Sequence, residues 1–382
     1  MNSFRKWTVY FTAALAVMSV LTFCKKDADL PNGGEPKISY VRVTSPASSD
    51  SLLVGAAQGK LIAIIGENLG GAAQMWFNDQ SASLNPTYIT PTSIIVNVPS
   101  QIPLAISNKL KIVFKDGKTL LYDFQVQISK PDVSSLVSEF VLTGEVATIR
   151  GNYFYQPLTV TFTGGVTGTV VSVKDLEIQV RVPAGAQPGP ITVKTNFGET
   201  KSNFYFRDDR NHFIDSDPYE GWWNSSYVVT NPGSGDPVAI SGNYIRFKKP
   251  IGGWSWNEVA GGPANAMPVH SKNIPDAAIL KPEDYNMKFE VNTLKPYSAN
   301  MLKINVALNA EDNNAYLWQP PVDTKGQWQT IVIPFETVVA SYAVKPTVNP
   351  NGYWSRLLFH GAGDLDADIS FDNFRVVPKV AK

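Results

Sequence analysis

An internal repeat is the feature that most constrains the fold of this chain. Three apolar blocks recur in the same order about 85 residues further along, as expected for two copies of one structural unit. Residues 61–69 align with 146–154, 94–99 with 176–183, and 110–117 with 191–198. The repeat predicts two similar domains, over residues 37–128 and 129–206.

Each copy has the residue pattern of a small β-sandwich. Apolar and polar residues alternate in the repeated blocks, which turns one face of each strand inward. Gly66 and Gly151 follow the first repeated strand and would permit a turn there. Pro99 and Pro183 would end a later strand, because proline cannot donate a ladder hydrogen bond.

These blocks resemble immunoglobulin-like domains of the IPT/TIG family, which occur as spacers in surface proteins and beside DNA-binding domains. The 382 residues include 28 glycines and 27 prolines among many β-branched and aromatic residues, which favours strands joined by turns. We therefore expect an all-β chain with two immunoglobulin-like sandwiches and a larger jelly-roll-like sandwich over residues 207–382.

The last 176 residues differ in composition from the repeats. All tryptophans except Trp7 and Trp76 lie there. The alternation predicts strands at residues 243–248, 286–291, 301–308, 328–334, 356–359 and 369–377. Residues 325–334 and 369–376 resemble recurring strands of carbohydrate-binding jelly rolls, which makes Trp328 a core residue. Trp318 fits either a core or a binding role.

The N-terminus resembles a bacterial lipoprotein signal. Arg5 and Lys6 precede an apolar run that ends at Cys24, the only cysteine. Residues 21–24 resemble a lipobox, so we expect a signal peptide over residues 1–24, a lipid on Cys24 and a flexible leader over 25–36. The acidic residues after Cys24 resemble the surface-export signal of Bacteroidetes lipoproteins, which implies an outer-membrane lipoprotein facing outward. A plain signal peptide or an uncleaved anchor is the alternative.

Two tryptophan-containing loops are the candidate binding site. Residues 252–262 read GGWSWNEVAGG, and in an extended chain Trp254 and Trp256 would point to one face. Trp222 and Trp223 would face opposite ways, so only one is expected to reach a ligand. Tyrosine and tryptophan combine a large apolar face with a polar edge, which suits the two sides of a sugar ring. The other candidates are the aromatic pair Tyr353 and Trp354 and the polar residues Asn224, Asn257 and Glu258. The alternative is that the rings belong to the core and the polar groups to ordinary turns.

The whole chain resembles the surface glycan-binding lipoproteins encoded with SusC/SusD-like uptake systems in Bacteroidetes. That resemblance implies non-catalytic binding of a polysaccharide, a β-glycan such as xyloglucan, mixed-linkage β-glucan or mannan, through the last domain. The implied partners are the polysaccharide, a SusC/SusD-like outer-membrane complex and the membrane, through the lipid anchor. Nucleic acid is excluded because the 33 basic residues are balanced by 33 acidic ones and form no cluster.

Two other functions remain open. A glycoside hydrolase or polysaccharide lyase would need paired carboxylates, and several are available, although none lies in a recognisable catalytic motif. Adhesion through the immunoglobulin-like domains is the second. No metal site is expected, because His212, His270 and His360 lack zinc-ligand spacing. No cofactor is expected apart from a structural calcium, for which 208–209 and 364–368 offer aspartates.

Overall fold

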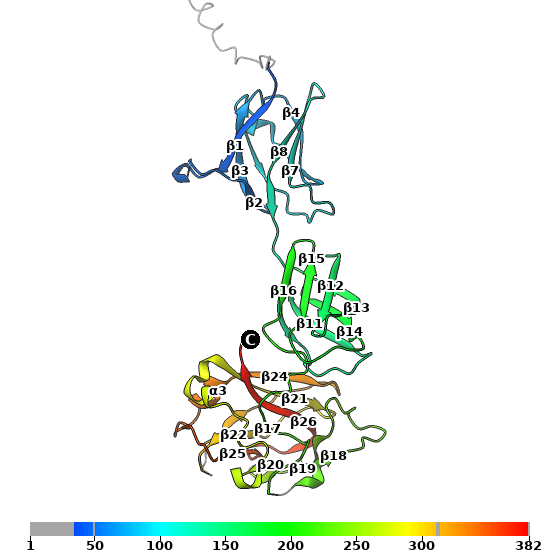
Figure 1. Ribbon diagram of the computed structural model, residues 1–382, viewed down its shortest axis with the longest axis vertical. Coiled ribbons are helices and arrows are strands. Elements are labelled where there is room, and N and C mark those ends of the chain that lie inside the picture. Colours follow the sequence, from blue (N-terminus) through cyan, green and yellow to red (C-terminus); the bar gives the residue numbers. More distant parts are fainter. Residues whose placement is uncertain (1–33, 49, 223, 311–313, 381–382) are drawn as a thin grey trace, which may run out of the picture. The chain divides into compact units, whose positions relative to one another are not determined.

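The computed structural model describes residues 34–380, apart from residues 49, 223 and 311–313. The predicted signal peptide, Cys24 and most of the leader therefore lie outside the described residues, as does Trp223. The chain divides into two compact units, residues 1–128 and 129–382 (Figure 1). In the described part of the chain, no helix has the length and apolar character needed to cross a membrane.

The first unit is a sandwich of short antiparallel strands. One sheet has the order β1 (Lys37–Val43), β3 (Leu61–Glu67), β6 (Ser93–Asn97). The other has the order β5 (Gln80–Ala82), β4 (Ala72–Phe77), β7 (Lys109–Phe114), β8 (Thr119–Asp123). A parallel pair, β2 (Gly55–Ala57) and β9 (Gln125–Gln127), and two 3₁₀ turns, η1 (Pro46–Ser48) and η2 (Pro86–Tyr88), complete it. The inward-facing side chains of both sheets form one core.

The second unit begins with the other copy of the repeat. Its strands follow the order β10 (Asp132–Leu136), β11 (Val146–Asn152), β14 (Glu177–Arg181), β13 (Val166–Lys174), β12 (Leu158–Phe162), β15 (Thr192–Thr195), β16 (Gly198–Lys201). The long strand β13 joins the two layers, because its first residues pair with β12 and its later ones with β14. This domain has its own core.

The repeated glycines have a different role from the predicted one. Gly66 and Gly151 lie inside β3 and β11 rather than in turns. Each is opposite a β-bulge in the partner strand, between Ile38 and Tyr40 in β1 and between Val133 and Ser135 in β10. A Cβ atom would lie 2.0 Å from the Lys37 carbonyl oxygen at Gly66 and 1.9 Å from that of Asp132 at Gly151. Glycine is required because two backbones approach closely at a bulge.

We expect Gly66→Ala to lower the free energy of unfolding of the first unit by about 1–3 kcal/mol, since the methyl group meets backbone that cannot move aside cheaply. Denaturant titration measures the change. Gly71→Ala is the control, because its Cβ would lie 3.7 Å from the nearest atom, on Phe114. Equal stability of the two variants would contradict the role given to Gly66.

The C-terminal domain is a two-layer antiparallel sandwich. One sheet has the order β18 (Val228–Val229), β19 (Tyr244–Ile251), β26 (Leu365–Pro378), β21 (Tyr285–Thr293), β24 (Gln329–Pro334), with β17 (His212–Ile214) also paired to β26. The other has the order β20 (Asn257–Gly262), β25 (Trp354–Phe359), β22 (Leu302–Leu308), β23 (Tyr316–Trp318). Short helices lie in the connections: η3 (Ser225–Tyr227), η4 (Ala264–Ala266), α2 (Asp276–Leu280), η5 (Pro282–Asp284) and α3 (Phe335–Ala340).

The predicted all-β fold is confirmed, and each of the six strands expected after residue 207 overlaps an observed strand. Aromatic contacts across the two layers, such as Phe247 with Phe359 at 5.1 Å between ring centroids, place the core between them. Trp318 is 7% exposed and belongs to this core. Trp328 is not the core residue that was expected, because it is half-buried and lies outside the core cluster. It contacts Tyr244 edge-on and donates its indole N–H to the Val238 carbonyl, which indicates a structural role.

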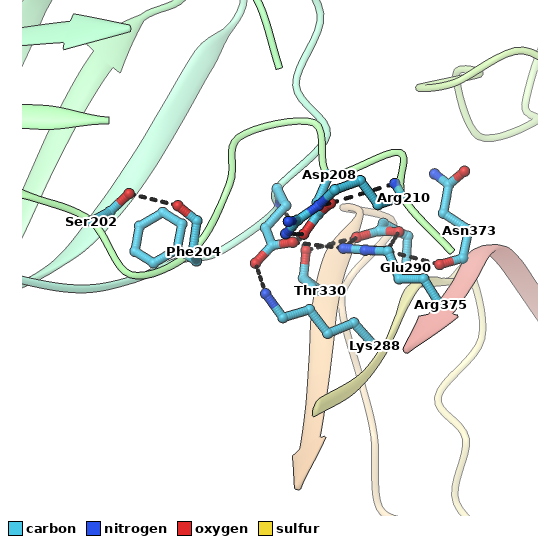
Figure 2. A network of polar contacts seen from close by, with 10 residues as sticks. Ser202, Phe204, Asp208, Arg210, Lys288, Glu290, Thr330, Asn373 and Arg375 are labelled. Carbon is cyan, nitrogen blue, oxygen red and sulfur yellow. Dashed lines mark hydrogen bonds and ion pairs between the residues drawn. The ribbon is translucent and has the colours of Figure 1, made fainter. Parts of the chain in front are cut away.

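A buried cluster of charged side chains joins the second immunoglobulin-like domain to the C-terminal sandwich (Figure 2). We call Glu139, Lys288, Glu290 and Arg375 the junction cluster. Lys288 Nζ lies 2.5 Å from Glu139 Oε1, and Arg375 donates to Glu139 Oε2 at 2.6 Å. Arg375 also donates to Glu290 at 2.8 Å. All four side chains are at most 5% exposed.

Hydrogen bonds around the junction cluster complete the connection. The Thr330 hydroxyl donates to Glu290 at 2.9 Å and accepts the Glu139 backbone N–H at 2.7 Å. The Thr330 backbone N–H donates to the Val137 carbonyl at 2.9 Å. Burial raises the pKa of the Glu290 carboxyl, against the opposing effect of the Arg375 guanidinium. Two acidic and two basic groups thus hold the two domains together.

Candidate functional site

The loop 252–256, which carries the two candidate tryptophans, is a turn rather than an extended segment. Trp254 has a φ of 62°, in the left-handed region. The Ser255 hydroxyl donates to the Gly252 carbonyl at 2.6 Å, and the Trp254 backbone N–H donates to the Gly361 carbonyl at 2.6 Å. The predicted extended alternation is therefore wrong. A left-handed non-glycine residue is uncommon and is found preferentially at functional sites.

The turn leaves both tryptophan rings in solvent. Trp254 is 65% exposed and Trp256 is 56% exposed. Both rings contact His360, with centroid distances of 5.6 Å and 5.3 Å. We call Trp254 and Trp256 the tryptophan platform. Two exposed indoles that contact the same residue form an apolar surface outside the hydrophobic core.

Glu258 and Arg356 hold the ring of Trp256. The Trp256 indole N–H donates to Glu258 Oε1 at 2.9 Å, and Arg356 donates to the same oxygen at 3.3 Å. The Arg356 guanidinium lies 5.2 Å from the Trp256 ring centroid and 4.7 Å from that of Trp354. Both distances lie within the range in which a guanidinium gains cation–π attraction from an indole. Glu258 therefore orients a platform ring, which differs from the predicted contact with a ligand.

The other predicted polar residues have internal partners. Asn224 Nδ2 donates to the Glu258 carbonyl at 3.1 Å, which attaches the loop around Trp222 to β20. Asn257 is 9% exposed, and its Nδ2 donates to Ser255 Oγ at 2.8 Å. Trp222 is 43% exposed, and its backbone N–H donates to the Gly261 carbonyl at 3.3 Å. The structure thus places the Trp222 loop against the strand that follows the platform.

The prediction that Tyr353 and Trp354 stack on a ligand is wrong. Tyr353 is 1% exposed and Trp354 is 3% exposed, because the chain passes directly from the 349–352 turn into β25, in the middle of the second sheet. The Tyr353 hydroxyl donates to Asp276 at 3.3 Å and accepts the Asn349 backbone N–H. Burial raises the pKa of Tyr353.

The candidate calcium ligands have partners of their own. Asp208 pairs with Arg210 at 2.7 Å, Asp366 with Lys295 at 2.5 Å and Asp368 with Arg246 at 2.7 Å. Asp364 accepts the Gly253 backbone N–H at 2.8 Å. The described residues contain no group of three His, Cys, Asp or Glu side chains able to hold a metal ion. A structural calcium stays a prediction, which a thermal melt with and without chelator would test.

Comparison with known families finds a match for the domain that carries the platform. Residues 206–378 match the family model described as the surface glycan-binding protein B xyloglucan binding domain. The C-terminal domain is therefore similar to this family over nearly its whole length. The resemblance to Bacteroidetes surface glycan-binding proteins noted in the sequence is thereby confirmed.

Relatives outside the family model extend the similarity to the rest of the chain. An IPT/TIG domain-containing protein of Bacteroides ovatus is 33% identical over 148 residues, which are 37% of this chain and 29% of that protein. The chain thus spans under a third of that relative. The crystal structure of the surface glycan-binding protein PbSGBP-B from Prevotella bryantii superposes with a TM-score of 0.66 at 24% identity, covering 91% of this chain and 100% of that one. SGBP-B from a complex xyloglucan utilization locus in Bacteroides uniformis gives 0.50 at 18% identity, over 90% and 100%. Both solved structures share the fold of this chain.

Sequence reasoning missed two residues that contact the tryptophan platform. Arg356 and His360 contact the platform rings, yet both lie about 100 residues after them in the chain. The pairing of β20 with β25 brings them together. The available signal was the two-residue period of a strand, which places residues 354, 356, 358 and 360 on one face of the sheet. Which side chains they contact on that face is known only once the partner strand is known.

Proposed function

We propose that the protein binds a β-linked glucan of the xyloglucan or mixed-linkage type without cleaving it. The observation that carries the proposal is the exposed tryptophan platform, Trp254 and Trp256, on a domain of the xyloglucan-binding family. The family description supports xyloglucan as the first of these glucans. Mixed-linkage glucan offers the platform the same β-linked glucose rings without side branches.

The chemistry of the platform suits a pyranose chain. The C–H face of a sugar ring packs flat against an indole, and tryptophan supplies this area with few rotatable bonds to order. The Glu258 and Arg356 contacts fix the orientation of Trp256 before a ligand arrives, which lowers the entropic cost of binding. His360 supports both rings from a strand end.

Non-catalytic action is the second part of the proposal. Hydrolysis of a glycosidic bond uses two carboxyl groups placed on either side of it. Next to the platform, Glu258 is bonded to Trp256 and Arg356, and Asp364 accepts a backbone N–H of the same loop. These bonds support a structural role for both carboxylates.

The third part of the proposal concerns location. A lipid on Cys24 anchors the chain in the outer membrane, facing outward, where it delivers glucan to a SusC/SusD-like uptake complex. The signal-like N-terminus and the surface glycan-binding family support this placement. Metabolic labelling with a radioactive fatty acid tests the anchor, with Cys24→Ser as the unlabelled control.

Affinity electrophoresis of the purified protein tests the function. We expect slower migration in native gels containing xyloglucan or mixed-linkage β-glucan than in gels without polysaccharide, and no new reducing ends after long incubation. A starch gel controls for nonspecific retention. Free migration in every β-glucan gel would contradict the proposal, and new reducing ends would contradict its non-catalytic part.

A further inference from the structure

The turn that presents the ring of Trp254 has a conformation that its own sequence disfavours. Trp254 occupies the third position of a four-residue turn, which the Ser255 backbone N–H closes by donating to the Gly252 carbonyl at 3.2 Å. The φ of Trp254 is 62°, a left-handed value for which this turn position normally has glycine or asparagine. A bulky left-handed residue is strained and persists only when the surrounding structure holds it. The position of this platform ring therefore depends on contacts from outside the turn.

The segment 360–364 supplies the first of these contacts. The Trp254 backbone N–H donates to the Gly361 carbonyl at 2.6 Å, and the Gly253 backbone N–H donates to Asp364 Oδ1 at 2.8 Å. A Cβ atom at Gly253 would lie 3.1 Å from the Gly363 backbone nitrogen, so the two segments approach each other backbone to backbone. The strained residue and the residue before it are thus both bonded to one neighbouring segment.

The buried side chain of Asn300 connects that segment to the turn from a third part of the chain. Asn300 is 5% exposed, and its backbone N–H donates to the Ala362 carbonyl at 2.9 Å. Its Nδ2 donates to the Gly363 carbonyl at 3.1 Å and, more weakly, to the Gly252 carbonyl at 3.5 Å. Its Oδ1 accepts the Met301 backbone N–H at 2.9 Å, so both ends of the amide are bonded.

These contacts fix the turn to both layers of the C-terminal sandwich. The loop 252–256 leaves β19 in one sheet and enters β20 in the other. Asp364 directly precedes β26, the neighbour of β19, whereas Asn300 lies two residues before β22, in the sheet that contains β20. Neither residue belongs to the hydrophobic core. We call Asn300 and Asp364 the platform brace.

We propose that Asn300 and Asp364 are positioning residues for glycan binding, which act by holding the strained turn that presents the Trp254 ring. This inference rests on the proposed function and adds two residues that need not touch the ligand. Without the brace, the backbone of Trp254 is free to leave the left-handed region, and the ring leaves the surface on which a sugar stacks. Binding then has to restore the turn, which weakens affinity.

Calorimetric titration with soluble xyloglucan tests the proposal. We expect Asn300→Gly and Asp364→Ala each to weaken binding about fivefold, the effect of losing about one hydrogen bond. Glycine at position 300 keeps the left-handed backbone, where φ is 65°, and removes only the amide. Asp364→Asn is expected to retain more affinity than Asp364→Ala, because its amide oxygen can still accept the Gly253 N–H.

A double-mutant cycle distinguishes positioning from a general loss of structure. When Trp254 is already replaced by alanine, each brace substitution is expected to change affinity by under about twofold, because the ring through which it acts is absent. A thermal melt of every variant shows whether it is folded at the temperature of the titration. The matched control is Asp366→Ala, which removes an exposed carboxylate of β26 that pairs with Lys295 and not with the turn, and is expected to bind as the wild type does.

The possible results separate the failure of this inference from that of the function. If both brace variants bind xyloglucan as the wild type does, or lose the same factor with and without the Trp254 ring, the brace does not position that ring. Should Asn300→Gly fail to fold, the exposed Asp364 and its two variants still decide the question. If the wild-type protein binds neither xyloglucan nor mixed-linkage β-glucan, the proposed function is wrong and this inference is wrong with it.

Discussion

Trp254→Ala and Trp256→Ala are each expected to weaken β-glucan binding at least tenfold, which corresponds to about 1.4 kcal/mol or more. The two rings are 65% and 56% exposed, so their removal takes away most of the flat apolar area offered to a sugar chain. The measurement is the retardation of each variant in gels of increasing polysaccharide concentration. The effect is expected to be confined to binding, since neither ring belongs to a hydrophobic core.

The control for these variants is Tyr88→Ala. Tyr88 is 50% exposed but lies in the first unit, outside the C-terminal domain that matches the glycan-binding family. Its retardation is expected to equal that of the wild type. Retardation that survives both tryptophan substitutions would show that the platform is not the binding surface.

Arg356→Lys distinguishes the orientation of the Trp256 ring from the stacking of that ring on a sugar. Lysine keeps the positive charge near Glu258 but lacks the planar guanidinium that lies within cation–π distance of the rings of Trp256 and Trp354. We therefore expect Arg356→Lys to weaken β-glucan binding less than Trp256→Ala does, because Arg356 acts through the Trp256 ring that it supports.

The six strands expected after residue 207 were predictable because their pattern is local, whereas β17, β18, β20 and β23 were missed. Alternation has a period of two residues, and each expected strand after residue 207 coincides with an observed one. The repeated glycines were also identified from the local pattern, but their structural role was not predicted correctly. Only the pairing of β3 with β1 reveals that Gly66 faces a carbonyl oxygen rather than a turn.

The site was predicted only in part, because exposure depends on tertiary packing. The turn 349–352 has the composition of a surface loop, which made Tyr353 and Trp354 look accessible. The sheet continues through Trp354 in β25, a strand with a neighbour on each side, and both residues are buried. In contrast, Gly252 and Gly253 did indicate a loop before Trp254, and the rings of Trp254 and Trp256 are exposed. The same expectation was wrong for residues 257–262, since Gly261 and Gly262 lie in strand β20.

Residues that act across domains had no signal in the sequence. Glu139 lies 236 residues before Arg375, and nothing near either residue indicates its partner. Charged residues are almost never fully buried unless they are paired, so the sequence favoured a surface position for both. The fold overrides that preference by bringing two acidic and two basic groups together.

Arg375→Met is expected to lower the free energy of unfolding of the second unit by about 3–5 kcal/mol, because it leaves Glu139 and Glu290 buried without their shared cation. Methionine keeps much of the side-chain volume, so a cavity contributes little to the change. Tryptophan fluorescence during denaturant titration follows mainly the C-terminal domain, since all tryptophans except Trp7 and Trp76 lie there.

The matched control is Arg150→Met, at an exposed arginine of the second immunoglobulin-like domain, which is expected to change stability by under about 0.5 kcal/mol. A double substitution that replaces Glu139 and Lys288 by Gln and Met is expected to cost less than the sum of the single changes, because it removes charges of both signs from one network. If Arg375→Met unfolds at the same denaturant concentration as Arg150→Met, the junction cluster does not hold the two domains together. In that case the hydrogen bonds of Thr330 to Glu139 and Val137, rather than the ion pairs, would connect the two domains.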